Sequence, residues 1–329
     1  MPDAVPPLRL LLVGCGGIAI AYLQALARTP QFALAAVVEP DAKRVTPDGV
    51  PRFATLQDFL TSGPGCDAAL VLTPPASHEA LATRLSAAGL HVLCEKPLAP
   101  TIAAAERMLA AAHAAGRRLM MGSKFRYTPD VAIAHRLLRD GACGDVVLYE
   151  NVFCSHVDMT RRWNADPAQS GGGVLIDNGC HSVDIARFLL GPIARVQAQF
   201  GRRAQAIAVE DTARLLFTSR SGALGSIDLS WSVHKETDSY VRVHGTRGTV
   251  EVGWRASRWK PVGGDWRPLG AGYDKVAAFA GQLADFAAAI AGGSPVIDDA
   301  DAMASVVVVD CAYRSERESR WIDVPEAVQ

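Results

Sequence analysis

Residues 8–19 read LRLLLVGCGGIA, and residues 32–39 read FALAAVVE. The apolar run over 8–13 predicts a buried strand, the amphipathic stretch over 20–27 predicts a helix, and 32–38 predicts a second strand. Between strand and helix, the spacing G-x-G-x-x-G/A is filled by Gly14, Gly16 and Ala19. A strand, a glycine turn, a helix, a second strand and a closing acidic residue form the pattern of a dinucleotide-binding unit.

Each residue type in this unit has a physical task. Gly14 permits the tight turn, and Gly16 lets the backbone approach a pyrophosphate. The free N–H groups of the helix start, at Gly17 and Ile18, then face the anion. Glu39 can accept hydrogen bonds from both ribose hydroxyls and would repel a 2′-phosphate, which favours NAD as the cofactor. Lys43 and Arg44 follow closely, so NADP stays open as the less favoured alternative.

Strand and helix patterns keep alternating through the first half of the chain. Strands are expected over 68–72, 91–94 and 119–122, and helices over 77–88 and 101–115. Such repeats predict a doubly wound parallel sheet whose ligands bind at the carboxyl ends of the strands. The loops at these ends carry further candidates for cofactor binding, namely Thr73, Pro74, His78 and Glu95.

Three stretches together resemble one known family. GCGGIA, TPPASH and GLHVLCEKPLAPT occur in the first half, and GGGVLIDNGCHSVDIARFLLG occupies 171–191. In this order and at these distances they resemble the glucose-fructose oxidoreductase, inositol dehydrogenase and rhizopine-catabolism (Gfo/Idh/MocA) family. The resemblance implies a Rossmann domain over 1–123 and a substrate-binding and oligomerisation domain over 124–329. Many members oxidise or reduce a carbinol of a sugar, sugar derivative or cyclitol with NAD(P).

Three residues are the candidates for catalysis. Lys96 follows a strand end where the nicotinamide should lie, and its ammonium can hydrogen-bond the reacting oxygen, the role that the resemblance also implies. His181 is the natural general base because its unperturbed pKa is about 6.5. Asp177 precedes it by four residues and could orient it or hold a substrate hydroxyl. Asp184, one turn further on, is expected to support the site from behind.

Other polar residues are candidates for substrate binding. Lys124 and Arg126 follow the last Rossmann strand, and Arg126 could bind a substrate oxygen or carboxylate. Arg162 and Trp163 combine a cation with an aromatic platform, which suits a sugar ring or an anionic group. Surface ion pairs explain either set equally well. The glycines at 171–173 indicate close approach of the backbone to a ligand or to another strand, with a flexible loop as the alternative.

The second half contains five β-rich runs separated by short turns, near residues 196–201, 212–217, 223–231, 240–245 and 249–254. Helices are expected over 275–291 and 301–315. The pattern predicts an α+β domain with a large open, mainly antiparallel sheet. One face of this sheet stays free, and in the resembled family that face often forms a subunit interface, which implies a homodimer or homotetramer.

Composition excludes several classes of protein. The net charge is -1, from 33 basic and 34 acidic residues, so there is no basic surplus for nucleic acid. No apolar stretch approaches the roughly 20 residues of a membrane helix. The seven cysteines are scattered without a CxxC pair, which argues against disulfides and for the cytoplasm. No paired His/Cys spacing indicates a metal.

The leading hypothesis is therefore an NAD-dependent dehydrogenase or ketoreductase of a sugar, sugar derivative or cyclitol. The alternative that the family offers is a glycoside hydrolase that retains NAD and cleaves by transient oxidation and elimination. A cofactor-binding regulator without catalysis is the third reading, and the presence of both Lys96 and His181 disfavours it.

Overall fold

The computed structural model describes residues 6–325, which form two sheets with helices packed around them. The first sheet has the order β3-β2-β1-β4-β5-β6, and its strands are parallel. They are β1 (Leu8–Val13), β2 (Phe32–Val38), β3 (Arg52–Phe53), β4 (Ala68–Val71), β5 (His91–Glu95) and β6 (Leu119–Gly122). The helices that connect them are α1 (Gly17–Leu26), α2 (Leu56–Ser62), α3 (His78–Ala87) and α4 (Ile102–Ala114). The predicted doubly wound sheet is confirmed.

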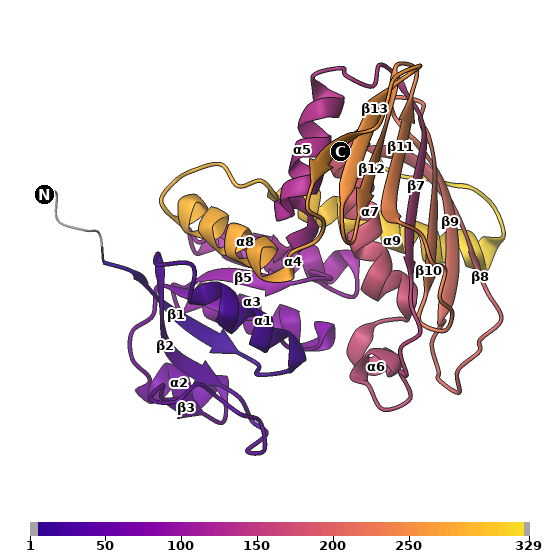
Figure 1. Ribbon diagram of the computed structural model, residues 1–329. Helices are drawn as coiled ribbons and strands as arrows, with labels where there is room; N and C mark the ends of the chain where they lie inside the picture. Colours follow the sequence, from indigo (N-terminus) through magenta and orange to yellow (C-terminus); the bar gives the residue numbers. More distant parts are fainter. Residues whose placement is uncertain (1–5, 326–329) are drawn as a thin grey trace, which may run out of the picture.

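A helix from the far end of the chain completes this first layer (Figure 1). α8 (Lys275–Ile290) packs on α1, and its Phe279, Leu283 and Phe286 are buried in one core with β1. α9 (Asp299–Glu318) packs against α4. The predicted domain boundary after residue 123 falls just past β6 and stays a prediction. The outermost residues of the two predicted domains, 1–5 and 326–329, lie outside the described part of the chain.

The second sheet has the order β14-β13-β12-β11-β7-β10-β9-β8-β15 and is antiparallel except where β10 pairs with β7. The strands are β7 (Val146–Cys154), β8 (Ile193–Phe200), β9 (Thr212–Ser219), β10 (Leu224–Ser230), β11 (Ser239–Gly245), β12 (Gly248–Gly253), β13 (Ser257–Pro261), β14 (Arg267–Gly270) and β15 (Ile322–Asp323). The mainly antiparallel open sheet is thus confirmed. β7 at its centre was not among the five predicted runs.

Helices cover the side of the second sheet that faces the first (Figure 1). They are α5 (Pro129–Arg139), α7 (Cys180–Leu190) and α9, with the short α6 (Pro167–Ser170) below them. On the opposite face, Leu148 of β7 lies beside Leu224 of β10, and both are about half exposed. The homodimer or homotetramer expected from such a free face stays a prediction. Among residues 6–325, no helix is both long enough and apolar enough to cross a membrane.

The segment before α7 differs from the regular helix that would place Asp177 and His181 on one face. α6 ends at Gly171 in a left-handed conformation, a π-helical turn occupies Leu175–Gly179, and α7 begins only at Cys180. The wider turn changes the direction of side chains relative to an ideal helix. Asp177 and His181 therefore do not meet as the spacing of four residues predicts, and each has a different partner.

Candidate active site

The glycine loop leaves open space at the start of α1. Gly14 has a φ of +93°, and a Cβ there would lie 3.0 Å from Thr73 Cγ2, so glycine is required. α1 begins at Gly17, three residues earlier than expected, and no side chain caps it. A Cβ on Gly16 or Gly17 would meet nothing within 4 Å. Uncapped N–H groups facing free space fit a pyrophosphate, so these residues suit the NAD that the fingerprint predicts.

Glu39 lies buried beside this loop, directly after β2. Its Oε2 accepts a hydrogen bond of 2.7 Å from the N–H of Cys15, and its Oε1 accepts one of 2.9 Å from the N–H of Asp41. The carboxylate is therefore held in one place at the end of the glycine turn. The free lone pairs of both oxygens suit a ribose diol.

Replacing Glu39 by alanine is expected to weaken NAD binding about tenfold, the equivalent of one hydrogen bond of about 1.4 kcal/mol. NADP binding should weaken less, because the repulsion of its 2′-phosphate disappears with the carboxylate. Calorimetric titration with each dinucleotide measures both effects. Glu106→Ala, on the exposed side of α4, is the matched control. An equal loss for the two dinucleotides would contradict the role of Glu39 in cofactor choice.

The loops after β4 and β5 are tied together by a buried histidine. His78 is fully buried, with its Nε2 2.8 Å from the carbonyl oxygen of Thr73 and its Nδ1 3.1 Å from that of Pro97. Both ring nitrogens face backbone carbonyls, so the ring is turned away from any ligand. This corrects the assignment of His78 to cofactor binding: it positions the two loops that carry Thr73, Pro74 and Lys96.

Glu95 joins the first helix to the loop that carries Lys96. Its Oε1 accepts a 2.5 Å hydrogen bond from the hydroxyl of Tyr22, and its Oε2 accepts one of 3.1 Å from the N–H of Lys96. Tyr22 in turn accepts a hydrogen bond from Gln282 of α8. The carboxylate is nearly buried, so it fixes the backbone at Lys96 relative to α1 and α8.

Lys96 forms an ion pair with Asp177. Its Nζ lies 2.6 Å from Asp177 Oδ1 and 3.1 Å from the carbonyl oxygen of the same residue. Although burial alone would lower it, the pKa of Lys96 is raised above its ordinary value, because Asp177 favours the charged form. Lys96 therefore stays an ammonium, and Asp177 orients this lysine and not His181.

His181 meets a second lysine. Its Nε2 lies 3.4 Å from Lys124 Nζ, while its Nδ1 is buried without a hydrogen-bond partner among the described residues. Burial and the positive charges of Lys124 and Lys96 lower the pKa of His181 well below 6.5, so the ring is neutral at pH 7. Lys124, which follows β6, thus lies within hydrogen-bond distance of His181, and its role in substrate binding stays a prediction.

Arg126 does not reach the site. It is 4% exposed, and its guanidinium contacts Asp184 at 2.7 Å and Asp301 at 2.6 Å. Ser123 also donates to Asp184. A guanidinium buried between two carboxylates is satisfied by them, which corrects the expectation that Arg126 binds substrate. Asp184 supports the fold behind the site, as expected.

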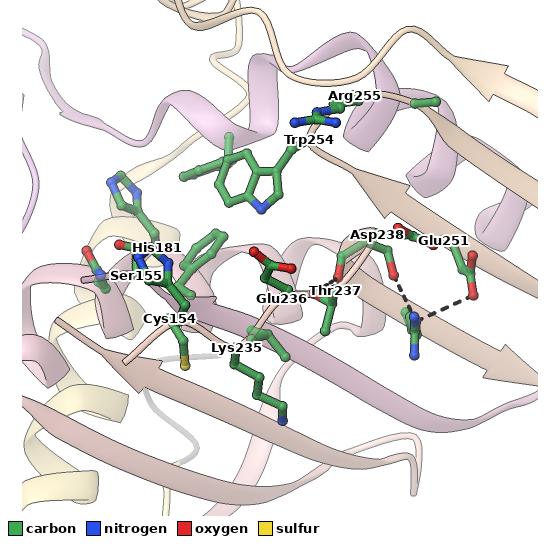
Figure 2. Close-up of a pocket in the computed structure, with 18 of the residues that line it drawn as sticks. Cys154, Ser155, His181, Lys235, Glu236, Thr237, Asp238, Glu251, Trp254 and Arg255 are labelled. Carbon is green, nitrogen blue, oxygen red and sulfur yellow. Dashed lines mark hydrogen bonds and ion pairs between the residues drawn. The ribbon is translucent and has the colours of Figure 1, made fainter. Parts of the chain in front are cut away.

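An open cavity of about 1310 Å³ is lined by Lys96, Lys124, Asp177 and His181 together with residues of the second sheet. Figure 2 shows the indole of Trp254 and the carboxylate of Glu236 turned toward the same space, beside His181 and Ser155. Further lining residues that the sequence analysis did not identify are Thr237, Asp238, Arg242, Glu251, Arg255 and Arg258.

A topological signal connects these missed residues. β7 and β10 are parallel, and β12 runs in the same direction because it is antiparallel to β11, which is antiparallel to β7. The residues that follow all three strands therefore gather at one edge of the sheet, which is where the cavity lies. Without β7 in the predicted set, this common edge could not be inferred.

One pair of substrate-binding candidates lies away from the cavity lining. Arg162 and Trp163 are exposed on the loop before α6, and their role in substrate binding stays a prediction. Of the residues that follow β10, Trp231 is buried, whereas His234 and Lys235 line the cavity. Within residues 6–325, no group of three or more His, Cys, Asp or Glu side chains could hold a metal ion.

The glycines at 171–173 allow other parts of the fold to approach. A Cβ on Gly172 would lie 2.1 Å from the hydroxyl of Tyr313, and one on Gly173 would lie 2.0 Å from the carbonyl oxygen of Glu210. The N–H of Gly173 donates to the carboxylate of Glu210. The close approach is thus to the chain before β9 and to α9.

Gly173→Ala is expected to lower the free energy of unfolding by about 1–3 kcal/mol, because the added methyl group forces the Glu210 backbone away. Gly65→Ala is the control, since Arg9 Nη1, at 4.0 Å, is the one atom of residues 6–325 found near its added Cβ. Urea unfolding of both variants tests this. If the free energy of unfolding changed by less than about 0.5 kcal/mol in both variants, as is typical of surface sites, the backbone around Gly173 would be able to move aside without cost.

Comparison with known proteins agrees with this geometry. Residues 8–123 match the model described as the oxidoreductase family, NAD-binding Rossmann fold, and residues 131–251 match that of the GFO/IDH/MocA C-terminal domain. D-apiose dehydrogenase of Paraburkholderia graminis is 28% identical over 335 residues, which cover 95% of this chain and 88% of the relative. Inositol 2-dehydrogenase of Leifsonia xyli is 27% identical over 265 residues, which cover 77% of this chain and 76% of the relative.

The solved structures include a near relative as well. The aldose-aldose oxidoreductase from Caulobacter crescentus, complexed with glycerol, superposes with a TM-score of 0.84 at 27% identity. The match covers 96% of this chain and 99% of that one. The likeness therefore extends over both sheets and includes the regions that carry Lys96 and His181.

Proposed function

Because the chain belongs to the Gfo/Idh/MocA family of NAD-binding oxidoreductases, we propose that it transfers a hydride between NAD and a carbinol or ketone carbon of a sugar, sugar derivative or cyclitol. The observation that carries the proposal is the cluster of Lys96, Asp177, His181 and Lys124 in one cavity. The cluster offers a fixed positive charge, which can stabilise the developing alkoxide, and a pair of side chains that can exchange the hydroxyl proton. Carbinol oxidation requires both.

The residues of the first sheet fit the cofactor. Gly14, Gly16, Gly17 and the uncapped start of α1 would hold the pyrophosphate, and Glu39 would hold a ribose. When bound there, NAD supplies or accepts the hydride. Glu95 fixes the loop that carries Lys96 relative to α1, which aligns the catalytic ammonium with the cofactor site.

The reacting oxygen needs an electrostatic partner. In oxidation the hydroxyl oxygen gains negative charge as its proton leaves, and a fixed ammonium stabilises that charge. Lys96 fills this role because Asp177 keeps it charged and orients its Nζ. The proton passes to the hydrogen-bonded pair of His181 and Lys124, and in reduction it returns by the same route.

The cavity suits a polyhydroxylated substrate. Trp254 presents an aromatic face, and Glu236 and Asp238 form no ion pair within the described part of the chain, so their oxygens can accept hydrogen bonds from hydroxyl groups. The relatives act by name on D-apiose, inositol and aldoses. With Arg126 buried, the sequence-based case for an anionic sugar loses one of its two arginines.

The test is absorbance at 340 nm while purified protein meets NAD or NADP with a panel of aldoses, polyols, cyclitols, uronic acids and sugar nucleotides. Formation of NADH with one class supports the proposal and identifies the substrate class. No turnover in either direction, combined with release of NAD only on denaturation, would instead favour the NAD-retaining glycoside hydrolase of the same family.

A further inference from the structure

We propose that Lys124 is a catalytic residue, the group on which the hydroxyl proton comes to rest, with His181 Nε2 as the hydrogen-bond acceptor that aims its amine. The inference rests on the proposed function and specifies its proton-exchange step. It assigns different tasks to the two lysines of the cavity: Lys96 carries a permanent charge, and Lys124 gains and loses a proton.

The surroundings of Lys124 differ from those of Lys96. Lys124 lies at the start of the 3₁₀ turn η2 (Lys124–Tyr127), and its Nζ is 5.0 Å from the ring centre of Phe125 and 5.7 Å from that of Phe279. Its one hydrogen-bond contact within residues 6–325 is with His181 Nε2, and it forms no ion pair there. A desolvated amine without a carboxylate partner is the arrangement that lets a lysine act as a base.

The charges that face Lys124 come from four elements. Lys96 after β5 and Lys275 of α8 disfavour its ammonium form, whereas Glu95 of β5 and Asp177 of the π-helical turn favour it. Burial and the nearby ammonium of Lys96 outweigh the two carboxylates and lower the pKa of Lys124 to about 8. Two lysines in one site with pKa values displaced in opposite directions are the expected mark of separate acid–base tasks.

The hydrogen bond to His181 explains how the lone pair of Lys124 Nζ can face the cavity. A neutral amine has two N–H donors and one lone pair, so one N–H can donate to Nε2 while the lone pair faces the cavity. After it takes up a proton, the ammonium keeps the same bond to Nε2. His181 therefore needs neither a second proton nor a change of tautomer during the reaction.

The step balances as follows. In oxidation the carbinol O–H bond breaks, and the lone pair of Lys124 Nζ forms the new N–H bond. The electron pair of the O–H bond closes the carbonyl, and the carbinol hydrogen leaves as the hydride of the proposed function. A proton resting on His181 would instead place an imidazolium in a buried site near the ammonium of Lys96, which burial and that charge oppose.

The first experiment compares Lys124→Ala with the wild-type enzyme and with Lys260→Met, which removes a lysine that lies outside the cavity lining, over the ring of Trp266. For wild-type oxidation, kcat/KM should rise with pH through a pKa near 8, because Lys124 must be neutral to accept a proton. Lys124→Ala should lower turnover by at least about 10²-fold and should abolish this rise of kcat/KM with pH. Added propylamine should restore turnover, with a pH dependence set by the amine. Lys260→Met should keep both the turnover and the pH dependence of the wild type.

Two results of this comparison would overturn the proposal. One is turnover of Lys124→Ala within about fivefold of the wild type with the same pH limb. The other is a large loss of turnover that propylamine does not restore, since a residue that only shapes the cavity would behave in this way.

A second measurement does not depend on turnover. In protein labelled with ¹³C-lysine and loaded with NAD, the ε-carbon resonance that is missing from Lys124→Ala should titrate near pH 8. A value above about 10, the ordinary range for lysine, would overturn the proposal even if the variant is inactive. If the wild type oxidises no carbinol while this resonance still titrates near pH 8, the proposed function has failed and the ionisation assigned to Lys124 has not.

Discussion

Lys96→Met is expected to lower kcat by about 10²- to 10³-fold while the affinity for NAD changes by less than about threefold. Methionine keeps most of the length of the side chain and removes the charge that faces the reacting oxygen. The loss falls on kcat because negative charge develops on that oxygen only as its proton departs. Asp177, which is 21% exposed, is left without its partner but can be solvated from the cavity.

Three measurements separate this role from a structural one. Thermal unfolding should show that Lys96→Met is folded, and calorimetry should show that it binds NAD. Lys260→Met is the control, because that ammonium lies over the ring of Trp266, away from the catalytic cluster. Turnover of Lys96→Met within about tenfold of the wild type would mean that the oxygen is stabilised by another group.

The sequence predicted the parts of this site that depend on local pattern. The strand, glycine turn and helix at the start of the chain could be read because each follows from residues close together in the sequence. The helix start was misplaced by three residues, since Gly17 has a low helix propensity and yet begins α1. The loop after β5 was recognised for a similar reason: Glu95, Lys96 and Pro97 are adjacent.

Partners distant in sequence could not be predicted in this way. Asp177 is 81 residues from Lys96, and Asp301 is 175 residues from Arg126, so no spacing rule connects them. An arginine with two carboxylates in reach looks the same in sequence as one that binds substrate. The surroundings of His78 could not be predicted for the same reason, because only the fold shows that carbonyl oxygens from two loops converge on its ring.

The π-helical turn had the largest consequence for the mechanism. A regular helix would place Asp177 one turn before His181 on the same face and would make the carboxylate the orienting group of the histidine. The structure instead turns Asp177 to Lys96 and leaves His181 with Lys124. In the proposed mechanism the fixed charge and the proton exchange therefore belong to two different lysines, which the spacing of the sequence motif does not reveal.

His181→Ala is expected to lower turnover by at least about 10²-fold, with NAD affinity little changed. The imidazole is neutral and lies 3.4 Å from Lys124, so its removal leaves the amine without the acceptor that aims it. His181→Gln, whose side-chain oxygen can accept the same hydrogen bond, should recover part of the loss. His113→Ala, at an exposed position of α4, is the control.

The pH profile separates the possible tasks of His181. If the imidazole alone held the proton, kcat/KM for oxidation would be level down to pH values below 6.5 in the wild type, because the pKa of His181 is lowered by burial and by both lysines. If the pair acts as argued, the rate falls below pH 8 as Lys124 takes up the first proton, and falls more steeply once His181 takes up the second. If kcat/KM fell only below pH 6.5 and His181→Gln kept full activity, the roles assigned to Lys124 and His181 would both be contradicted.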